Sequence, residues 1–200
     1  DLLPTVLSAA FATQATAKNH NNEVGVSQTL LALRPDTERL VVEMGMRGLG
    51  QIRPLAKAAL PDVAVVTNVG PAHIGLLGSL ENIAQAKCEI FEGLEPDTGV
   101  AVLNGDDPLL RERLPAVWLG KTLRFGLVDA EGLRELPDGR HAFAFRGQAL
   151  ETPLPGLHQV ANTLLALTVG SELGVPWPAT SLPKGAGAAS PCRAANAAGC

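Results

Sequence analysis

Three polar residues whose side chains can take part in catalysis or ligand binding lie where packing alone would not place them. Glu43 ends the apolar segment LVVE, and His73 comes shortly after the apolar run Val63–Val66. Both runs are typical of strands buried on two faces. Lys87 lies in the apolar stripe of a predicted helix at 80–94. A carboxylate suits a hard cation, and burial strongly changes the pKa of an amine, so the three residue types together indicate a ligand site.

Each of these residues also has a simpler explanation. Lys87 alone can snorkel, with its methylenes on the apolar face and its ammonium in water, and His73 alone can be an ordinary loop histidine. However, Glu43 and His73 both follow the carboxyl ends of predicted core strands. In an open parallel sheet these ends share one edge, where such folds bind ligands. We therefore expect Glu43, His73 and Lys87 to converge at that edge.

The segments around these residues alternate between strand and helix patterns. After the strand at 40–43 come a helix at 51–59, a strand at 63–69, the helix at 80–94 and a strand at 100–104. This alternation predicts βαβ units. The expected fold is α/β, with a mostly parallel central sheet and flanking helices.

The pattern differs on both sides of this central part. An apolar face over residues 2–11 predicts an initial helix. From Thr122 onward, TLRFGL and HAFAFRGQAL are typical of short alternating strands separated by DAEGLRELPDGR, which predicts a small antiparallel ribbon beside the main sheet. A last helix has apolar positions from residue 160 and stops at Gly174.

Composition limits the class of protein. The chain has 200 residues, of which 46% are hydrophobic and 18% charged, as in an ordinary globular domain. The net charge of −4 and the lack of a long basic run argue against a nucleic-acid surface. No apolar run approaches the roughly 20 residues of a membrane span, and no secretory signal pattern is present, so we expect a cytoplasmic protein. The three cysteines lack the spacing of a disulfide framework or a zinc site.

The two ends of the chain differ in character from the rest. We expect one domain over residues 1–178. Residues 179–200 are almost all small and without periodicity, so we expect a disordered or non-native tail there.

Six segments, taken in order, carry a resemblance to a known family. They are NHNNEVGVSQTLL, VVEMGMRGLGQI, PDVAVVTNVGPAHIGLLGS, IAQAKCEIFEGL, GVAVLNGDDPLL and GLHQVANTLLAL. Over roughly residues 1–175 the chain resembles the central ATP-binding domain of the Mur ligases, which has a P-loop NTPase-like fold. It is most similar to the branch that adds D-alanyl-D-alanine to UDP-N-acetylmuramoyl-tripeptide. The resemblance implies an ATP-dependent amide ligase that acts through an acyl phosphate.

The resemblance also implies roles for the three residues with which we began. Glu43 and His73 match the positions of magnesium ligands, and Lys87 matches a lysine that family members carry as a carbamate, which is an anion that binds metal. The implied cofactors are ATP and magnesium. Carbamate formation needs the neutral amine, so partial burial in an apolar stripe suits Lys87.

Four further residues have implied roles in binding. Asn162 matches an asparagine that contacts adenine, and His158 belongs to the same nucleotide-binding segment. Asn162 can equally form a helix-end hydrogen bond to backbone. Asn21 and Asn22 lie in the loop that faces the muramoyl substrate.

The chain departs from the family pattern in several places. In the family pattern a glycine-rich phosphate loop comes before the part that matches residue 1, and segments that receive the incoming amine come after the matched domain; neither is among these 200 residues. Gln159 stands where the family often has asparagine. We therefore expect a piece of a ligase that is inactive alone and monomeric when full-length.

Two other functions remain open from the sequence. Folylpolyglutamate synthases and cyanophycin synthetases share the ATPase domain, although the NHNNEVG and GPAHIGLLGS segments favour the muramoyl branch. A non-catalytic Mur-like nucleotide-binding module would also fit the missing segments. Retention of Glu43, His73 and Lys87 argues against such a module, since it has no use for a metal-carbamate site.

Overall fold

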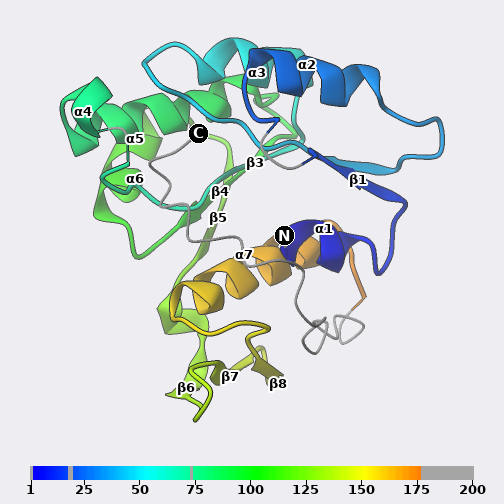
Figure 1. The fold of residues 1–200 in the computed structure, drawn as a ribbon, viewed down its shortest axis with the longest axis vertical. Helices are drawn as coiled ribbons and strands as arrows, with labels where there is room; N and C mark the ends of the chain where they lie inside the picture. Colours follow the sequence, from blue (N-terminus) through cyan, green and yellow to red (C-terminus); the bar gives the residue numbers. More distant parts are fainter. Residues whose placement is uncertain (1, 18–19, 73, 177–200) are drawn as a thin grey trace.

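A three-stranded parallel sheet forms the centre of the structure, which is a computed structural model that describes residues 2–17, 20–72 and 74–176. The strands are β3 (Val63–Val66), β4 (Val100–Asn104) and β5 (Lys121–Phe125), in the order β3-β4-β5 (Figure 1). In the register of these strands Val63 lies opposite Val100, which lies opposite Lys121. All three strands therefore begin at one edge and end at the other.

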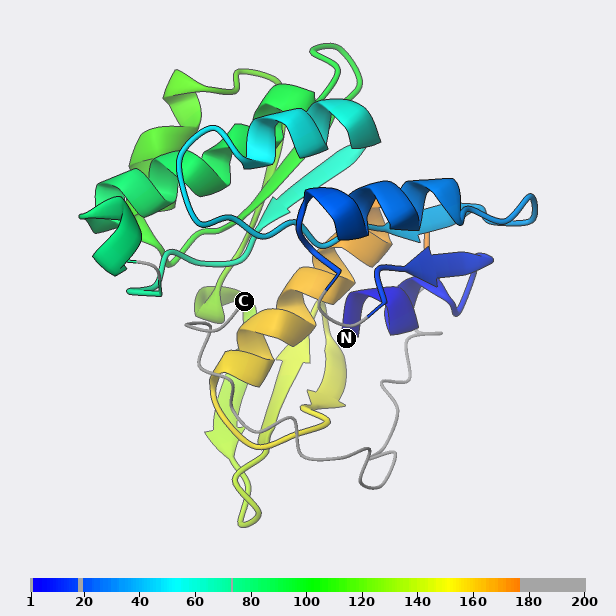
Figure 2. The same ribbon diagram turned by 45° about the horizontal axis from the view of Figure 1, so that its top comes forward.

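Helices cover both faces of this sheet (Figure 2). On one face lie α5 (Leu80–Cys88), the 3₁₀ helix η1 (Glu89–Gly93) and α6 (Pro108–Arg113), and on the other lies α7 (His158–Glu172). The central strand β4 is buried on both sides, which is why its sequence is an unbroken apolar run.

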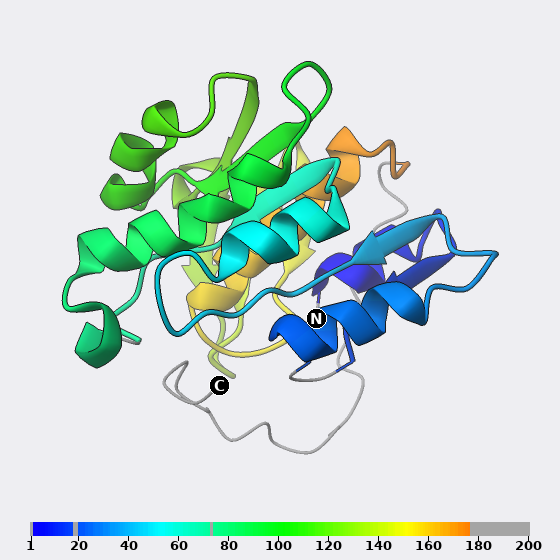
Figure 3. The ribbon, with the colours of Figure 1, turned by 90° about the horizontal axis from the view of Figure 1, so that it is seen from above.

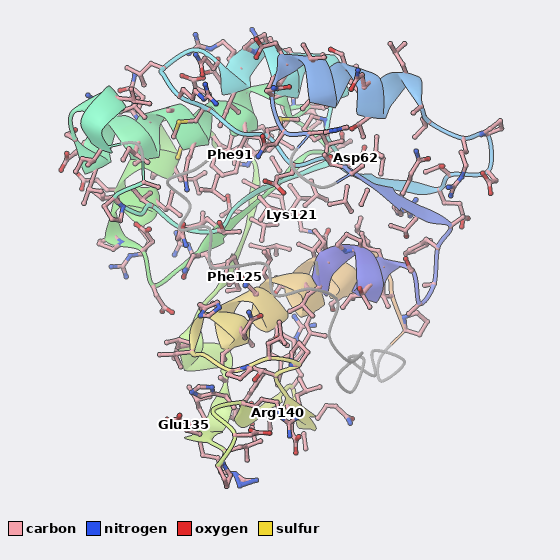
Figure 4. All side chains as sticks on the ribbon, in the orientation of Figure 1. Asp62, Phe91, Lys121, Phe125, Glu135 and Arg140 are labelled. Carbon is pink, nitrogen blue, oxygen red and sulfur yellow. The ribbon has the colours of Figure 1, made fainter. Side chains whose placement is uncertain are left out.

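Alternate side chains of β4 belong to two different cores. Val102 packs in the cluster with α7, whereas Leu103 packs in the cluster with α5, η1 and α6. Figure 4 shows the same division through two labelled aromatic residues, because Phe125 lies on the α7 side of the sheet and Phe91 on the opposite side. The sheet is thus the middle of three layers.

A second group of elements flanks this arrangement. The short strands β1 (Thr13–Ala15) and β2 (Arg39–Val41) form a separate parallel pair, so the prediction that the strand before Glu43 belongs to the central sheet is wrong. Helices α2 (Glu23–Leu31) and α3 (Ile52–Ala59) lie along the same side of the molecule (Figure 3), and α1 (Leu2–Leu7) packs on α7. The remaining short helices are α4 (Ile74–Leu77), η2 (Leu114–Ala116) and η3 (Leu127–Asp129).

The antiparallel ribbon is present but its strands differ from the prediction. It consists of β6 (Glu131–Glu135), β7 (His141–Phe145) and β8 (Gln148–Glu151). The prediction that TLRFGL belongs to the ribbon is wrong, because β5 pairs in parallel with β4. As the edge strand, β5 is buried on only part of its surface, so its sequence alternates like that of a ribbon strand. The segment that was expected to connect ribbon strands instead contains β6.

Two predicted helices are shorter in the structure. The helix expected at 80–94 is α-helical only to Cys88 and continues as η1. The change occurs beside α3, where a Cβ atom on Gly93 would lie 2.6 Å from the carbonyl oxygen of Ala56. Likewise, the first helix ends at Leu7 rather than near residue 11.

The predicted strand boundaries at the two functional segments also move. β2 ends at Val41 and β3 at Val66, so Glu43 and Asn68 lie in the loops that follow these strands. The expected tail at 179–200 lies outside the described residues. No helix in the described part of the chain is long and apolar enough to cross a membrane.

Candidate active site

Glu43 lies in the loop after β2, where hydrogen bonds fix both its backbone and its side chain. Its backbone N–H donates to Oγ1 of Thr16 at 3.0 Å, and its Oε1 accepts a hydrogen bond from Nδ2 of Asn21 at 2.9 Å. The carbonyl of Asn21 in turn accepts from the backbone N–H of Gly45 at 2.7 Å. A Cβ on Gly45 would lie 3.0 Å from the Asn21 side chain, so glycine permits this close approach. Asn21 therefore orients the Glu43 carboxylate.

Lys87 points toward the loop that follows β3. Its Nζ donates to the backbone carbonyl of Asn68 at 2.8 Å, and the residue is half-buried on α5. Burial lowers the pKa of the Lys87 ammonium, while the negative charge of Asp107 raises it by a smaller amount. The side chain is thus fixed on backbone, in an environment that favours the neutral amine more than water does.

An apolar cluster joins the Glu43 loop to the Lys87 helix. Its buried members are Met46, Ile52, Leu77, Ile83 and Ala86, and the partly buried residues at its border include Met44 and Val69. Met44 is next to Glu43, Val69 is next to Asn68, and Ala86 is next to Lys87. Figures 2 and 3 show the connection from β2 extending toward α5 before it turns back into α3. The structure therefore brings the Glu43 loop, the loop after β3 and the Lys87 helix into one region.

His73 lies outside the described residues, so its predicted place beside Glu43 and Lys87 stays a prediction. Within the described ranges there is no group of three His, Cys, Asp or Glu side chains that could hold a metal ion. The chemistry of the donors nevertheless fits magnesium. Glu43 is exposed, and among the described residues only its Oε1 has a hydrogen-bond partner, which leaves Oε2 available to a hard cation.

Asp107 is a residue of this region that sequence reasoning missed. It is the N-cap of α6, and its Oδ1 accepts from the backbone N–H groups of Leu109 at 3.1 Å and Leu110 at 3.3 Å. Its Oδ2 accepts from the N–H of Val69, in the loop after β3, at 2.6 Å. The NGDDP segment carries a recognisable helix-start signal, aspartate followed by proline. No signal in the sequence indicates the contact with Val69.

Glu89 was missed as well. It is only 3% exposed, and its carboxylate accepts from the N–H of Gly50 at 2.6 Å and from that of Arg53 at 3.2 Å. Gly50 lies just before the N-cap residue Gln51, which makes no side-chain cap, and Arg53 lies in the first turn of α3. Glu89 therefore caps α3 from another helix and holds the end of the loop that begins at Glu43.

The predicted nucleotide-binding residues lie on α7, on the other side of the sheet. His158 and Asn162 are both exposed, and His158 contacts Gln159 through their Nε2 atoms at 3.1 Å. Asn162 lies one turn inside α7, and within the described residues its side chain makes no hydrogen bond. The helix-end explanation for Asn162 is therefore wrong, and its amide is available to a ligand.

Asn22 has a structural role that the prediction did not include. It is the N-cap of α2, and its Oδ1 accepts from the backbone N–H of Gly25 at 2.9 Å. Its neighbour Asn21 contacts Glu43, as described above. Among the described residues, both of the asparagines predicted to bind substrate therefore make contacts within the protein.

An open hollow of about 340 Å³ lies away from these residues, between β5, the ribbon and the end of α7. Its lining includes Arg124, Asp129, Glu131, Arg146, Ser171 and Glu172. It contains none of the predicted site residues, and its charges are of both signs, so the strand-end region is the better candidate for chemistry.

Comparison with known proteins places this chain in a family. The chain is 43% identical over 177 residues to a UDP-N-acetylmuramoyl-tripeptide--D-alanyl-D-alanine ligase of Synechocystis sp., and the match covers 88% of this chain and 38% of that relative. The chain thus spans about two fifths of the length of the curated relatives it matches.

Solved structures give the same result. The fold is similar to that of MurF from Acinetobacter baumannii, with a TM-score of 0.81 and 31% identity over 89% of this chain and 40% of that one. It is also similar to MurF ligase from Thermotoga maritima in complex with ADP, with a TM-score of 0.74 and 32% identity over 88% of this chain and 42% of that one. The model of the Mur ligase middle domain matches residues 1–170, so the chain belongs to the Mur ligase middle-domain family.

Proposed function

We propose that this chain is the ATP-binding part of a ligase that adds D-alanyl-D-alanine to UDP-N-acetylmuramoyl-tripeptide in peptidoglycan synthesis. The relatives named for this activity support the proposal, as does the likeness to a MurF structure that holds ADP. The observation that carries it is that an apolar cluster brings the Glu43 loop and the Lys87 helix together. A ligase of this kind needs an anionic site beside the nucleotide phosphates, and Glu43 with a carbamate on Lys87 would supply it.

The proposed reaction has two steps. A carboxylate oxygen of the tripeptide attacks the γ-phosphorus of ATP, the bond to the β–γ bridging oxygen breaks, and an acyl phosphate and ADP result. The amine of D-alanyl-D-alanine then attacks the acyl carbon, phosphate leaves with the bonding electrons, and the amine loses a proton. Magnesium, when bound, neutralises the charge that spreads over the phosphate oxygens in the first step.

Glu43 and Lys87 would hold that magnesium together with His73. Asn21 holds the Glu43 carboxylate at Oε1, so Oε2 is presented in a fixed direction. At Lys87, the neutral amine adds to carbon dioxide and loses one proton, which gives an anionic carbamate. The nitrogen keeps one hydrogen, which can still donate to the Asn68 carbonyl. The lowered pKa of Lys87 supports this step because it raises the fraction of neutral amine.

The other predicted site residues lie on α7 and just before α2. Asn162 and His158 are proposed to contact the nucleotide from α7, since both are exposed. Asn21 and Asn22 retain a proposed place facing the muramoyl substrate, in addition to their contacts within the protein. ATP and UDP-linked substrates are cytoplasmic, so we propose that the enzyme acts in the cytoplasm; a monomeric full-length enzyme stays a prediction.

The test is a complete ligase, made by joining the flanking segments of the Synechocystis relative to both ends of this chain. We expect phosphate release that requires ATP, UDP-N-acetylmuramoyl-tripeptide and D-alanyl-D-alanine together, and a pentapeptide product of the expected mass. Glu43→Gln in the same protein is the control, and it should abolish release.

Three other outcomes would contradict the proposal. Extension of a folylpolyglutamate, or of a cyanophycin chain, in place of the muramoyl peptide would show another amide ligase. Nucleotide binding without turnover on any of these substrates would indicate a non-catalytic module.

A further inference from the structure

One peptide group in the loop after β3 is held from both sides by charged side chains. This is the peptide between Asn68 and Val69. Its carbonyl accepts from Nζ of Lys87 at 2.8 Å, and its N–H donates to Oδ2 of Asp107 at 2.6 Å. The two side chains come from different elements, α5 and the start of α6.

The side chain of Asp107 is held in place by helix α6. Its other oxygen, Oδ1, caps α6 through the N–H groups of Leu109 and Leu110. Leu110 is fully buried in the core cluster that also contains Leu103 of β4, so α6 is fixed to the sheet. The carboxylate therefore has little freedom to follow the loop, and the loop must take the position that Asp107 sets.

Because the peptide group is rigid, the position that Asp107 sets for the Val69 N–H also sets the direction of the Asn68 carbonyl, which Lys87 contacts. In a trans peptide the C=O and N–H bonds lie in one plane and point in opposite directions. A carboxylate can accept from the N–H but cannot pair with the carbonyl. Once Asp107 holds the N–H of Val69, the carbonyl of Asn68 must point away from Asp107, and that is the direction in which it meets Lys87.

We propose that Asp107 is a positioning residue that fixes Nζ of Lys87 through the peptide between Asn68 and Val69. The position of Nζ follows from the fold alone, whereas its consequence for catalysis rests on the proposed ligase function. The same hydrogen bond would direct the carbamate, because its nitrogen keeps one hydrogen for the Asn68 carbonyl. Asn68 and Val69 begin the segment of sequence that leads to His73, so the start of that segment is fixed as well.

Asp107→Asn separates this role from helix capping. Asparagine caps helices as well as aspartate does, so one oxygen can still serve Leu109 and Leu110. The amide nitrogen then replaces the acceptor that faces Val69. Asp106→Asn is a matched control, since the neighbouring Asp106 accepts from the backbone N–H of Leu127 in η3 at 2.7 Å and not from the loop after β3.

The first measurement uses this chain alone and needs no activity. By NMR, the Val69 amide should exchange with solvent about tenfold faster or more in Asp107→Asn, as expected for losing a hydrogen bond to a charged group. The Lys87 Cε resonances should move toward those of exposed lysines. Asp106→Asn should leave both signals unchanged. If Asp107→Asn does not fold, Asp107→Ser, which also caps helices but is too short to reach Val69, replaces it.

The second measurement uses the complete ligase. Asp107→Asn should lower kcat by about 10- to 100-fold, as for residues that orient a metal ligand, with little change in KM for ATP. Asp106→Asn should keep the wild-type kcat. Unchanged exchange at Val69, or an unmoved Lys87 signal, in a folded Asp107→Asn would overturn the proposal. So would a wild-type kcat despite altered NMR signals. If the unsubstituted ligase is inactive, the proposed function fails, and the NMR signals still decide the role of Asp107.

Discussion

Two regions of this molecule use their charged side chains in different ways. At the strand ends, Glu89 and Asp107 accept hydrogen bonds from backbone N–H groups of Gly50 and Val69, which are 39 and 38 residues away in the sequence. In the ribbon, Arg140 pairs with the carboxylates of Asp138 and Glu151 at the surface. Figure 4 shows Arg140 and Glu135 at the end of the molecule formed by the ribbon.

The consequence of losing a charge should differ between the two regions. Water can replace a lost partner at the exposed ribbon surface, so ion pairs there contribute little to folding. At the strand ends Glu89 is only 3% exposed and the contact of Asp107 with Val69 is half-buried, so water replaces a lost partner there less easily, and an unsatisfied buried group is costly. The strand-end carboxylates therefore fix the loops of the candidate site, whereas the ribbon is held by its strands.

The largest difference should appear in activity. In the complete ligase, Lys87→Arg and Glu43→Gln should each lower turnover by about 100-fold or more, because both remove anionic metal ligands. Arginine keeps its positive charge and cannot form the carbamate. Substrate-dependent phosphate release measures this, with Arg140→Gln in the ribbon as the unaffected control.

Two further observations would sharpen or break this prediction. A small added carboxylate should partly restore Lys87→Ala by supplying an anion, and bicarbonate should not. Near wild-type turnover of Lys87→Arg would show that Lys87 only snorkels and would leave Glu43 and His73 as the proposed metal ligands.

The next largest effect concerns stability at the strand ends. Glu89→Gln replaces one of two accepting oxygens by a donor, so the N–H of Gly50 or Arg53 loses its partner. We expect the free energy of unfolding to fall by about 1–3 kcal/mol, measured by urea titration. An unchanged urea midpoint would remove the distinction between the two regions.

A smaller effect should come from the two non-glycine residues with positive φ in the described chain, one at the end of α3 and one in the ribbon. Leu60 ends α3 with φ 46°, and Arg146 lies in the ribbon turn with φ 51°. Leu60→Gly should raise the free energy of unfolding by about 0.5–1 kcal/mol, because it removes left-handed strain from an exposed leucine.

Arg146→Gly should give a smaller gain than Leu60→Gly. It relieves the same kind of strain but also removes the hydrogen bond from Arg146 Nη1 to Oγ of Ser171, at 2.6 Å. Thermal unfolding of both variants and the wild type compares them directly. A larger gain for Arg146→Gly would mean that this contact adds nothing to stability.

The smallest effect is expected in the ribbon. Glu151→Gln removes one of the two surface partners of Arg140, and the melting temperature should stay within experimental error at low and at high salt. A clear loss of stability that disappears at high salt would show that the ribbon depends on its ion pairs after all.

Much of the fold was predictable because a strand that is buried on two faces has an unbroken apolar run in its own sequence. The apolar runs at β3 and β4 predicted central strands, and the helical spacing predicted α3 and α7. The α/β class and the family are confirmed. The edge strand β5 was assigned to the wrong sheet, since an edge strand is only half covered and its pattern does not say which neighbour it pairs with.

The local pattern of residue types was enough to predict which side chains do chemistry here. Glu43 and Lys87 stand out because a carboxylate after a core strand and an amine in an apolar stripe need a reason, and that can be seen within a few residues. Only the tertiary structure decided what holds them. Asn21 contacts Glu43 from 22 residues away, and Asp107 reaches Val69 from 38. Spacing along a helix or strand reports neighbours within a turn or two, whereas these contacts exist only once separate elements have packed around the sheet.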